Sequence, residues 1–167
     1  DYSTPTFSNT DYIVVSGSTL LGEAQNYVNY RNSVGYNAIL VDIETLYDQY
    51  AYGIRKHPFA LRNFVRFGMT HFSDSIKGLF IIGKAYKAGG SYNHRSSVQF
   101  YSQTIVPTYA NPPSDILLLS GIIDLYYQPA IPVGRLAARK PSDVAWYLEK
   151  VIDYESNAGA PYNPSMP

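Results

Sequence analysis

The chain has 167 residues, of which 46% are hydrophobic, enough for one domain with a buried core that needs no disulfides. Thirteen basic and thirteen acidic side chains cancel, so no basic field gathers nucleic acid, and no apolar run is long enough for a membrane-spanning helix. Cysteine is absent, which excludes a thiolate nucleophile, disulfides and cysteine-ligated metals within these residues.

The first half of the chain begins with a polar segment, residues 1–10, that predicts a lead-in arm. Asp11–Ser16 (DYIVVS) has adjacent β-branched residues and predicts a buried strand. Apolar residues at three- and four-residue spacing then predict a helix that Ser18 caps and Gly35 ends. Tyr36–Asp42 predicts a second strand. Together these elements form a β-α-β unit, whose strands we expect to be parallel.

Two helices and a central strand are predicted next. Asp42 is placed to cap a short helix over Ile43–Tyr52, and Pro58 suits the first turn of a longer helix with a buried apolar stripe. Within that helix, Gly68 indicates a close contact. Gly78–Gly83 (GLFIIG) is apolar throughout, which is typical of a central strand in a parallel sheet.

The remaining pattern is less regular. Residues 84–104 show no periodicity and predict a long loop, and Asp115–Leu119 is interpreted as extended. Ile131–Leu136 (IPVGRL) predicts the last strand, with its proline at the start or at a sheet edge. A final helix begins at Pro141.

Strands that alternate with helices predict an α/β fold over residues 11–157, with a three-layer, mostly parallel sheet flanked by helices. Ligand sites in such folds lie beyond the carboxyl ends of the strands. Here those ends fall near Ser16, Asp42, Lys84 and Arg135.

None of the usual catalytic or cofactor patterns is complete. The turn from Gly17 to Gly22 matches neither a dinucleotide fingerprint nor a phosphate loop, and G-x-S-x-G is absent. His57, His71 and His94 lack metal-ligand spacing, so we assign them surface or capping roles. The sequence therefore predicts no catalytic, cofactor-binding or metal-binding residue.

Three charged residues in the second half are candidates for structural roles. Asp115 and Asp124 flank the apolar run ILLLSGII, and calcium binding or paired acid/base chemistry stays open for them beside capping and turn roles. A guanidinium at Arg135, close to a strand end, is suited to locking a carboxylate such as Asp115 or Asp124. We favour these internal roles over substrate binding.

Tyrosine is the most unusual feature of the composition, with 17 residues. A tyrosine ring serves half-buried surfaces and interfaces because it has an apolar body and a polar tip. Tyr86, Tyr92 and Tyr101 fall in or beside the long loop, where they would form an interface for glycans or protein partners. The simpler interpretation is a surface adapted to the outside of a cell.

Taken in order, the segments resemble the N-terminal subdomain of the gingipain-type cysteine peptidases. The resemblance covers roughly Asp11 to Asn157 and is most specific from Ile131 to Glu155, where a GRL-A-R segment precedes a helix that starts at proline and ends in I-x-YE. The segments that carry it are DYIVVS, NYVNYRNSVGYNAILVDIETLYD, PFALRNFVRF, GLFIIG, VPTY, SD, IPVGRLAARKPSDV and EKVIDYES.

The resemblance implies a caspase-like unit of two parts, of which this chain is the first. The second part carries the catalytic histidine, in an HG pair, and the catalytic cysteine. Neither occurs here, so no catalytic residue transfers. Residues 158–167 would then be a linker toward the catalytic subdomain, which is the expected partner. The family also includes a surface peptidase that removes sorting signals in type IX secretion, which implies a secreted or bacterial cell-surface protein.

The chain departs from the family at one edge. Where the family commonly has an aspartate that helps bind calcium, after the glycine that ends the third strand, this chain has Lys84. The family usually has an acidic cluster after the Ser-Asp pair, which is Ser114-Asp115 in this chain. Here Asp124 alone represents that cluster, in an apolar stretch around Gly121. We therefore expect no calcium and no other cofactor.

Three functional hypotheses follow. The leading one is a buttressing subdomain, inactive on its own, of a secreted or surface cysteine endopeptidase. The alternative is a non-enzymatic surface module that binds glycan or protein through the Tyr-rich loop. A nucleotide-binding, flavodoxin-like domain is the third, motivated by the β-α-β start and weakened by the missing fingerprint.

Overall fold

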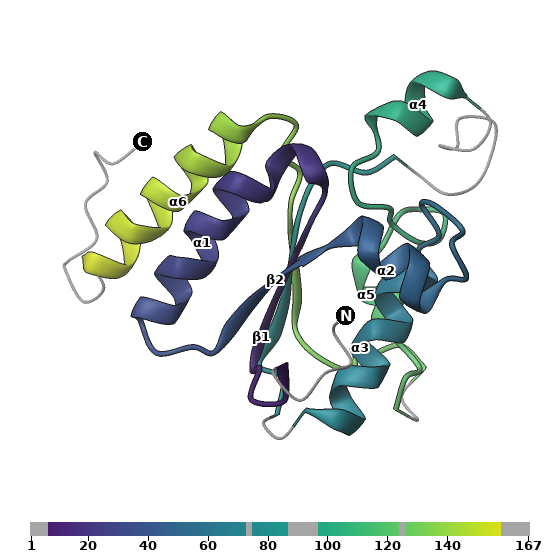
Figure 1. Ribbon diagram of the computed structural model, residues 1–167, viewed down its shortest axis with the longest axis horizontal. Coiled ribbons are helices and arrows are strands. Elements are labelled where there is room, and N and C mark those ends of the chain that lie inside the picture. Colours follow the sequence, from purple (N-terminus) through teal and green to yellow (C-terminus); the bar gives the residue numbers. More distant parts are fainter. Residues whose placement is uncertain (1–6, 73–74, 87–96, 124–125, 158–167) are drawn as a thin grey trace.

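A four-stranded, all-parallel sheet forms the centre of the molecule (Figure 1). The computed structural model describes residues 7–72, 75–86, 97–123 and 126–157. The strand order is β2-β1-β3-β4. The strands are β1 (Tyr12–Ser16), β2 (Ala38–Asp42), β3 (Gly78–Ile82) and β4 (Val133–Leu136). This arrangement confirms the predicted α/β fold, including the central position of the apolar third strand.

Helices cover both faces of the sheet (Figure 1). One face carries α1 (Leu21–Ser33) and α6 (Pro141–Ser156), which lie side by side. The opposite face carries α2 (Ile43–Tyr50), α3 (Phe59–His71) and α5 (Asp115–Leu119). The short helix α4 (Val98–Gln103) lies beyond the carboxyl ends of the strands. Within the described residues, no helix is long and apolar enough to span a membrane.

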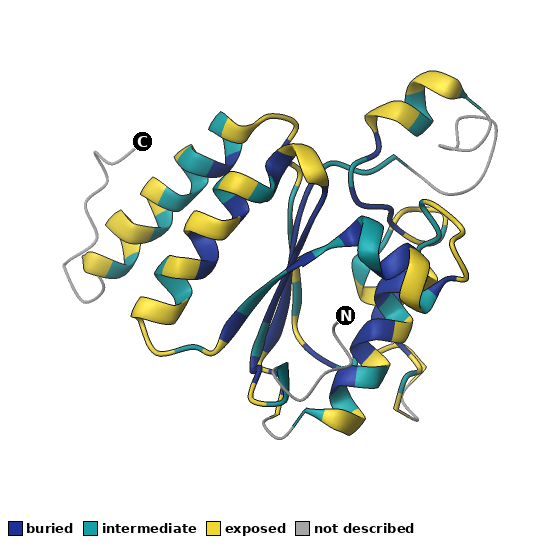
Figure 2. Cartoon of the chain, in the orientation of Figure 1, coloured by how far each residue is buried: buried dark blue, intermediate teal, exposed yellow. Residues whose placement is uncertain are grey.

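The sheet separates two hydrophobic clusters, and its strands are the most deeply buried part of the chain (Figure 2). In β1, Ile13 and Val15 pack toward α2 and α3, whereas Val14 packs toward α1 and α6. In β3, Ile81 and Phe80 divide in the same way. Successive side chains of a strand point to opposite faces, so a strand covered on both sides must be apolar at every position.

Several local predictions are confirmed. The Asp42 carboxylate accepts a hydrogen bond from the Glu44 amide at 3.0 Å and so caps α2. Gly35 ends the first helix with a φ of +95°, a conformation that favours glycine. A β-carbon on Gly68 would lie 2.9 Å from the Phe72 ring, which explains the glycine inside α3.

Three local predictions are wrong. Residues 84–104 are not a loop throughout, because Ser97 accepts a hydrogen bond from Phe100 and starts α4. Asp115–Leu119 is helical rather than extended, because Ser114 caps its Leu117 amide at 3.1 Å. Ser18 caps no helix, since Leu20 N bonds to Gly17 O and closes a 3₁₀ turn ahead of α1.

The termini fall mostly outside the described residues. Of the predicted arm, residues 1–10, only residues 7–10 are described, and Thr10 N there bonds to Phe7 O. The predicted linker, residues 158–167, lies outside the described part altogether. Both therefore stay predictions.

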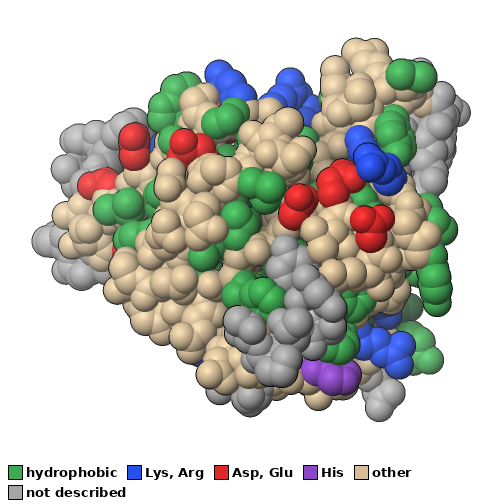
Figure 3. Space-filling model, in the orientation of Figure 1, with side chains coloured by type: hydrophobic (Ala, Val, Ile, Leu, Met, Phe, Trp, Pro, Cys, Tyr) green, Lys and Arg blue, Asp and Glu red, His purple; other side chains and the backbone are tan. Residues whose placement is uncertain are grey.

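Charged side chains are unevenly placed on the face shown in Figure 3. Acidic side chains gather over the start of α2 and over α6, whereas basic ones lie at the upper margin, beside the acidic group near α2 and at the lower right. The strands point toward the upper margin, so some of these basic side chains lie at the carboxyl edge of the sheet.

A polar cluster joins α1 to α6 across their exposed side. The Arg31 guanidinium contacts Glu155 Oε1 at 2.7 Å, and the Tyr30 hydroxyl donates to Glu155 Oε2 at 2.6 Å. Arg31 Nε also donates to the Tyr27 hydroxyl at 2.9 Å. The Tyr30 hydrogen bond and the nearby Arg31 charge lower the pKa of Glu155 and outweigh the opposing effect of desolvation.

Substituting Glu155→Gln removes this carboxylate and is expected to lower the free energy of unfolding at neutral pH by about 1 kcal/mol, the range of a partly exposed ion pair. The folded pKa of Glu155 lies below its unfolded value, so its contribution is present above about pH 4.3 and is lost as pH falls through the folded pKa. Urea unfolding from pH 7 to pH 3 measures both effects. The difference between wild type and variant should shrink toward acid pH, whereas the control Glu149→Gln, exposed on the same helix, should show little difference at any pH.

Candidate functional site

The carboxyl edge of the sheet is where the chain places most of its predicted site residues. Each strand ends there, and the segment from Ile105 to Thr108 crosses above β1 and β3. Ile105 N donates to Lys84 O at 2.8 Å, and Lys84 N donates to Ala138 O at 2.8 Å. These bonds tie the segments that follow β3 and β4 into one platform.

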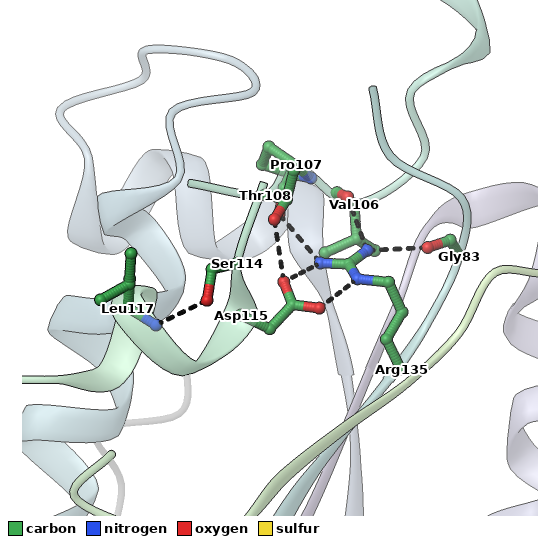
Figure 4. Close-up of polar contacts among 8 residues, drawn as sticks. All are labelled: Gly83, Val106, Pro107, Thr108, Ser114, Asp115, Leu117 and Arg135. Carbon is green, nitrogen blue, oxygen red and sulfur yellow. Dashed lines mark hydrogen bonds and ion pairs between the residues drawn. The ribbon is translucent and has the colours of Figure 1, made fainter. Parts of the chain in front are cut away.

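Arg135 is the centre of that platform (Figure 4). Its Nε and Nη2 donate to the two carboxylate oxygens of Asp115 at 2.7 and 2.8 Å. Nη1 donates to the carbonyls of Gly83 at 2.8 Å and Val106 at 2.9 Å, and Nη2 also donates to Pro107 O at 3.2 Å. A guanidinium has five N–H donors, and all five have partners here.

The contacts that Arg135 makes in the structure are internal to the domain. The side chains of Arg135 and Asp115 are only 13% and 18% exposed, and Asp115 Oδ1 also accepts from the Thr108 hydroxyl at 3.1 Å. No donor of Arg135 is left over for a substrate. Because Asp115 is the first residue of α5, the pair fixes that helix to the edge strand β4.

The same residues do not fit a calcium ion. Calcium needs several free oxygen ligands, whereas both oxygens of Asp115 bind Arg135, and Lys84, the residue after Gly83, is a cation. In the part of the chain that the structure describes, no three His, Asp or Glu side chains converge as metal ligands do. Asp124, the other acidic candidate, lies outside the described residues.

Two of the three tyrosines of the proposed binding loop, Tyr86 and Tyr101, make contacts within the domain. Tyr86 stacks on Phe100 with ring centroids 4.9 Å apart, and its hydroxyl donates to Gln103 Oε1 at 2.6 Å. Tyr101 lies 4.3 Å from the Lys56 ammonium, which also donates to its carbonyl. Tyr92 lies outside the described residues. Tyr86 and Tyr101 therefore hold α4 against the rest of the domain.

Next to the Arg135 cluster, a groove of about 300 Å³ opens at this edge. It is lined by Thr19, Lys84, Tyr86, Ser102, Gln103, Ile105 and Arg139. Sequence reasoning found Lys84 and Tyr86 but missed the others. Arg139 was recoverable, because it follows the last strand by three residues, whereas Ser102 and Gln103 reach the groove only through the unexpected helix α4.

The histidines take local roles. His57 Nδ1 accepts from the Phe59 amide at 3.2 Å, at the start of α3. His71 stacks on Phe67 with centroids 4.0 Å apart, near the end of the same helix. His94 lies outside the described residues. His71 Nδ1 also lies 2.7 Å from the Thr70 hydroxyl and 2.9 Å from Phe67 O, contacts within the last turn of α3.

Sequence and structure comparisons agree with the geometry. Residues 5–165 match Peptidase family C25, which is nearly the whole chain. The chain belongs to this family. Membership confirms the resemblance to gingipain-type cysteine peptidases that the ordered segments suggested.

One solved structure of another protein has the same fold as this chain. In the crystal structure of dimeric latent PorU from Porphyromonas gingivalis, the matching region has a TM-score of 0.67 and 21% sequence identity. The match covers 88% of this chain but only 16% of the PorU chain. At this identity the likeness establishes the α/β fold. The search of curated proteins gave no match.

Substituting Arg135→Met is expected to lower the free energy of unfolding by about 3 kcal/mol or more, because the Asp115 carboxylate and three carbonyls lose their guanidinium donor. Urea unfolding measures the loss, with Arg66→Met, an exposed arginine on α3, as the matched control. Adding Asp115→Leu to the first variant should recover part of the loss, since it removes the uncompensated charge. Equal stabilities of wild type and Arg135→Met would contradict the assigned role.

Proposed function

We propose that this C25 chain is a non-catalytic, buttressing subdomain of a gingipain-like cysteine endopeptidase. The observation that carries the proposal is a family match over residues 5–165 in a chain that has no cysteine. A cysteine peptidase needs a thiolate and a histidine that carries the proton, and the match extends over a part that contains no thiol. The nucleophile, its base and the oxyanion donors would come from a partner subdomain of the same polypeptide.

The physical role of this half would be to supply a rigid support. The sheet is buried on both faces, and Arg135 links β4, α5 and the crossing segment through charged hydrogen bonds. Catalytic groups must keep their geometry within a fraction of an ångström, which a well-packed neighbouring layer supports. We further propose that this half binds no calcium or other cofactor.

We place the protein outside the cell, as a secreted or bacterial cell-surface protein. Its family relationship and the fold shared with PorU of Porphyromonas gingivalis support this localisation. The tyrosine-rich, weakly charged composition agrees with it.

A surface module that binds glycan or protein through the Tyr-rich loop is the alternative. Tyr86 rests on Phe100 and Tyr101 lies against Lys56, so both rings already have intramolecular contacts. Those contacts reduce the aromatic surface left for a ligand, which favours the buttressing role. A glycan array probed with the chain distinguishes the two, because specific glycan binding would support the alternative.

The peptidase proposal predicts that the full-length gene product contains a His-Gly pair and a cysteine, both at strand ends, outside the 167 residues. An irreversible, cysteine-directed peptidase probe should label the full-length protein at that cysteine and leave the 167-residue chain unlabelled. Replacing the labelled cysteine with alanine should abolish both labelling and peptide hydrolysis. A gene product that lacks the His-Gly pair and the cysteine would overturn the proposal.

A further inference from the structure

The groove at the carboxyl edge is built from segments that are distant in the sequence. Thr19 follows β1, Lys84 follows β3, Arg139 follows β4, and Ser102 closes the far side from the end of α4. With strand order β2-β1-β3-β4, the chain connects outward in opposite directions from β1 and β3. In open parallel sheets, ligands bind beyond the strand ends at such a switch point.

The groove carries positive charge that nothing in its lining balances. Lys84 and Arg139 contribute two cations, and no acidic side chain of the described residues lines the groove. The Asp143 carboxylate lies outside the lining, where it accepts hydrogen bonds from the amides of Arg139 and Lys140 at the start of α6, and its charge offsets part of that of Arg139. In the described part of the chain, neither cation forms an ion pair, and the Lys84 ammonium lies 4.7 Å from the centroid of the Tyr86 ring.

The remaining lining suits an anion with an apolar body. Thr19 offers a hydroxyl donor, and Gln103 accepts from Tyr86 through Oε1, which leaves its amide nitrogen to donate. The Ser102 hydroxyl already donates to Gln99 O at 2.9 Å. Ile105 and the Tyr86 ring add apolar surface. The basic side chains along the upper margin of Figure 3 lie at the same edge of the molecule.

A phosphate on the backbone amides of the β1–α1 turn is excluded by packing. A β-carbon on Gly17 would lie 2.6 Å from Ile105 Cγ2, and one on Gly83 would lie 2.9 Å from the same methyl group. Ile105 therefore occupies the close approach that glycines usually leave for a phosphate. An anion here must be held by side chains, and the planar guanidinium of Arg139 matches a carboxylate as well as a phosphate, so inorganic phosphate is the competing anion in the test.

We infer that this groove binds a carboxylate, held between Lys84 and Arg139 with its aliphatic stem against Tyr86 and Ile105. The carboxylate can come from an acidic side chain of a peptide or from a free dicarboxylic acid, and both sources share this chemistry. The site goes beyond the proposed buttressing function and does not depend on it.

The test is an amide-resolved NMR titration of the full chain with four probes. These are glutarate, inorganic phosphate, an N-acetylated and C-amidated tetrapeptide with one glutamate, and the same peptide with glutamine in its place. Glutarate or the glutamate peptide should shift the amides of Thr19, Lys84, Ser102 and Arg139, whereas the glutamine peptide should not. Tighter binding of the peptide identifies a peptide ligand, and tighter binding of glutarate identifies a free acid.

Variants connect the shifts to the two cations. Lys84→Met with Arg139→Gln should weaken carboxylate binding by about tenfold or more, because each charged hydrogen bond contributes substantially. Lys150→Met with Arg66→Gln changes the net charge equally at exposed positions elsewhere and should keep the affinity within about twofold. Equal shifts with the glutamine peptide, no shift with either carboxylate, or tighter binding of inorganic phosphate at these amides would each overturn the inference.

Discussion

The buried guanidinium of Arg135 is the constraint on which the carboxyl edge depends. A charge with 13% side-chain exposure is stable only when its donors are paired, and each of its partners comes from a different turn of the chain. Asp115 brings in α5, Gly83 brings in the end of β3, and Val106 brings in the crossing segment. One side chain thus determines where three otherwise independent segments lie.

The path that Arg135 imposes on the crossing segment has a second consequence. With Val106 held by its carbonyl, the preceding Ile105 lies over Gly17 and Gly83. A sheet of this topology commonly receives a phosphate at that turn, but here a branched apolar side chain fills the space. The β-α-β start therefore has the topology of a nucleotide-binding fold without its phosphate cradle, in agreement with the missing glycine fingerprint.

The sequence was sufficient for the fold because the deciding signals were long and redundant. Strands such as GLFIIG are apolar throughout, and the longer helices carry several turns of apolar spacing. Two of the three errors fell on α4 and α5, which have six and five residues, and the third concerned the cap ahead of α1. Helices so short show no period, and their only signal is a capping serine, Ser97 or Ser114. The groove was missed because Ser102 and Gln103 reach it through α4.

Charge explains why the edge differs from the calcium-binding pattern implied by the gingipain resemblance. Replacing a carboxylate with the Lys84 ammonium changes the local charge by two units, and Asp115 is already neutralised by Arg135. Arg139 then adds to Lys84 without a carboxylate in the lining to offset it. Because like charges repel a divalent cation and attract an anion over the same few ångströms, this edge favours anions. This charge balance at the exposed edge of the sheet is the physical basis of the carboxylate site that we propose.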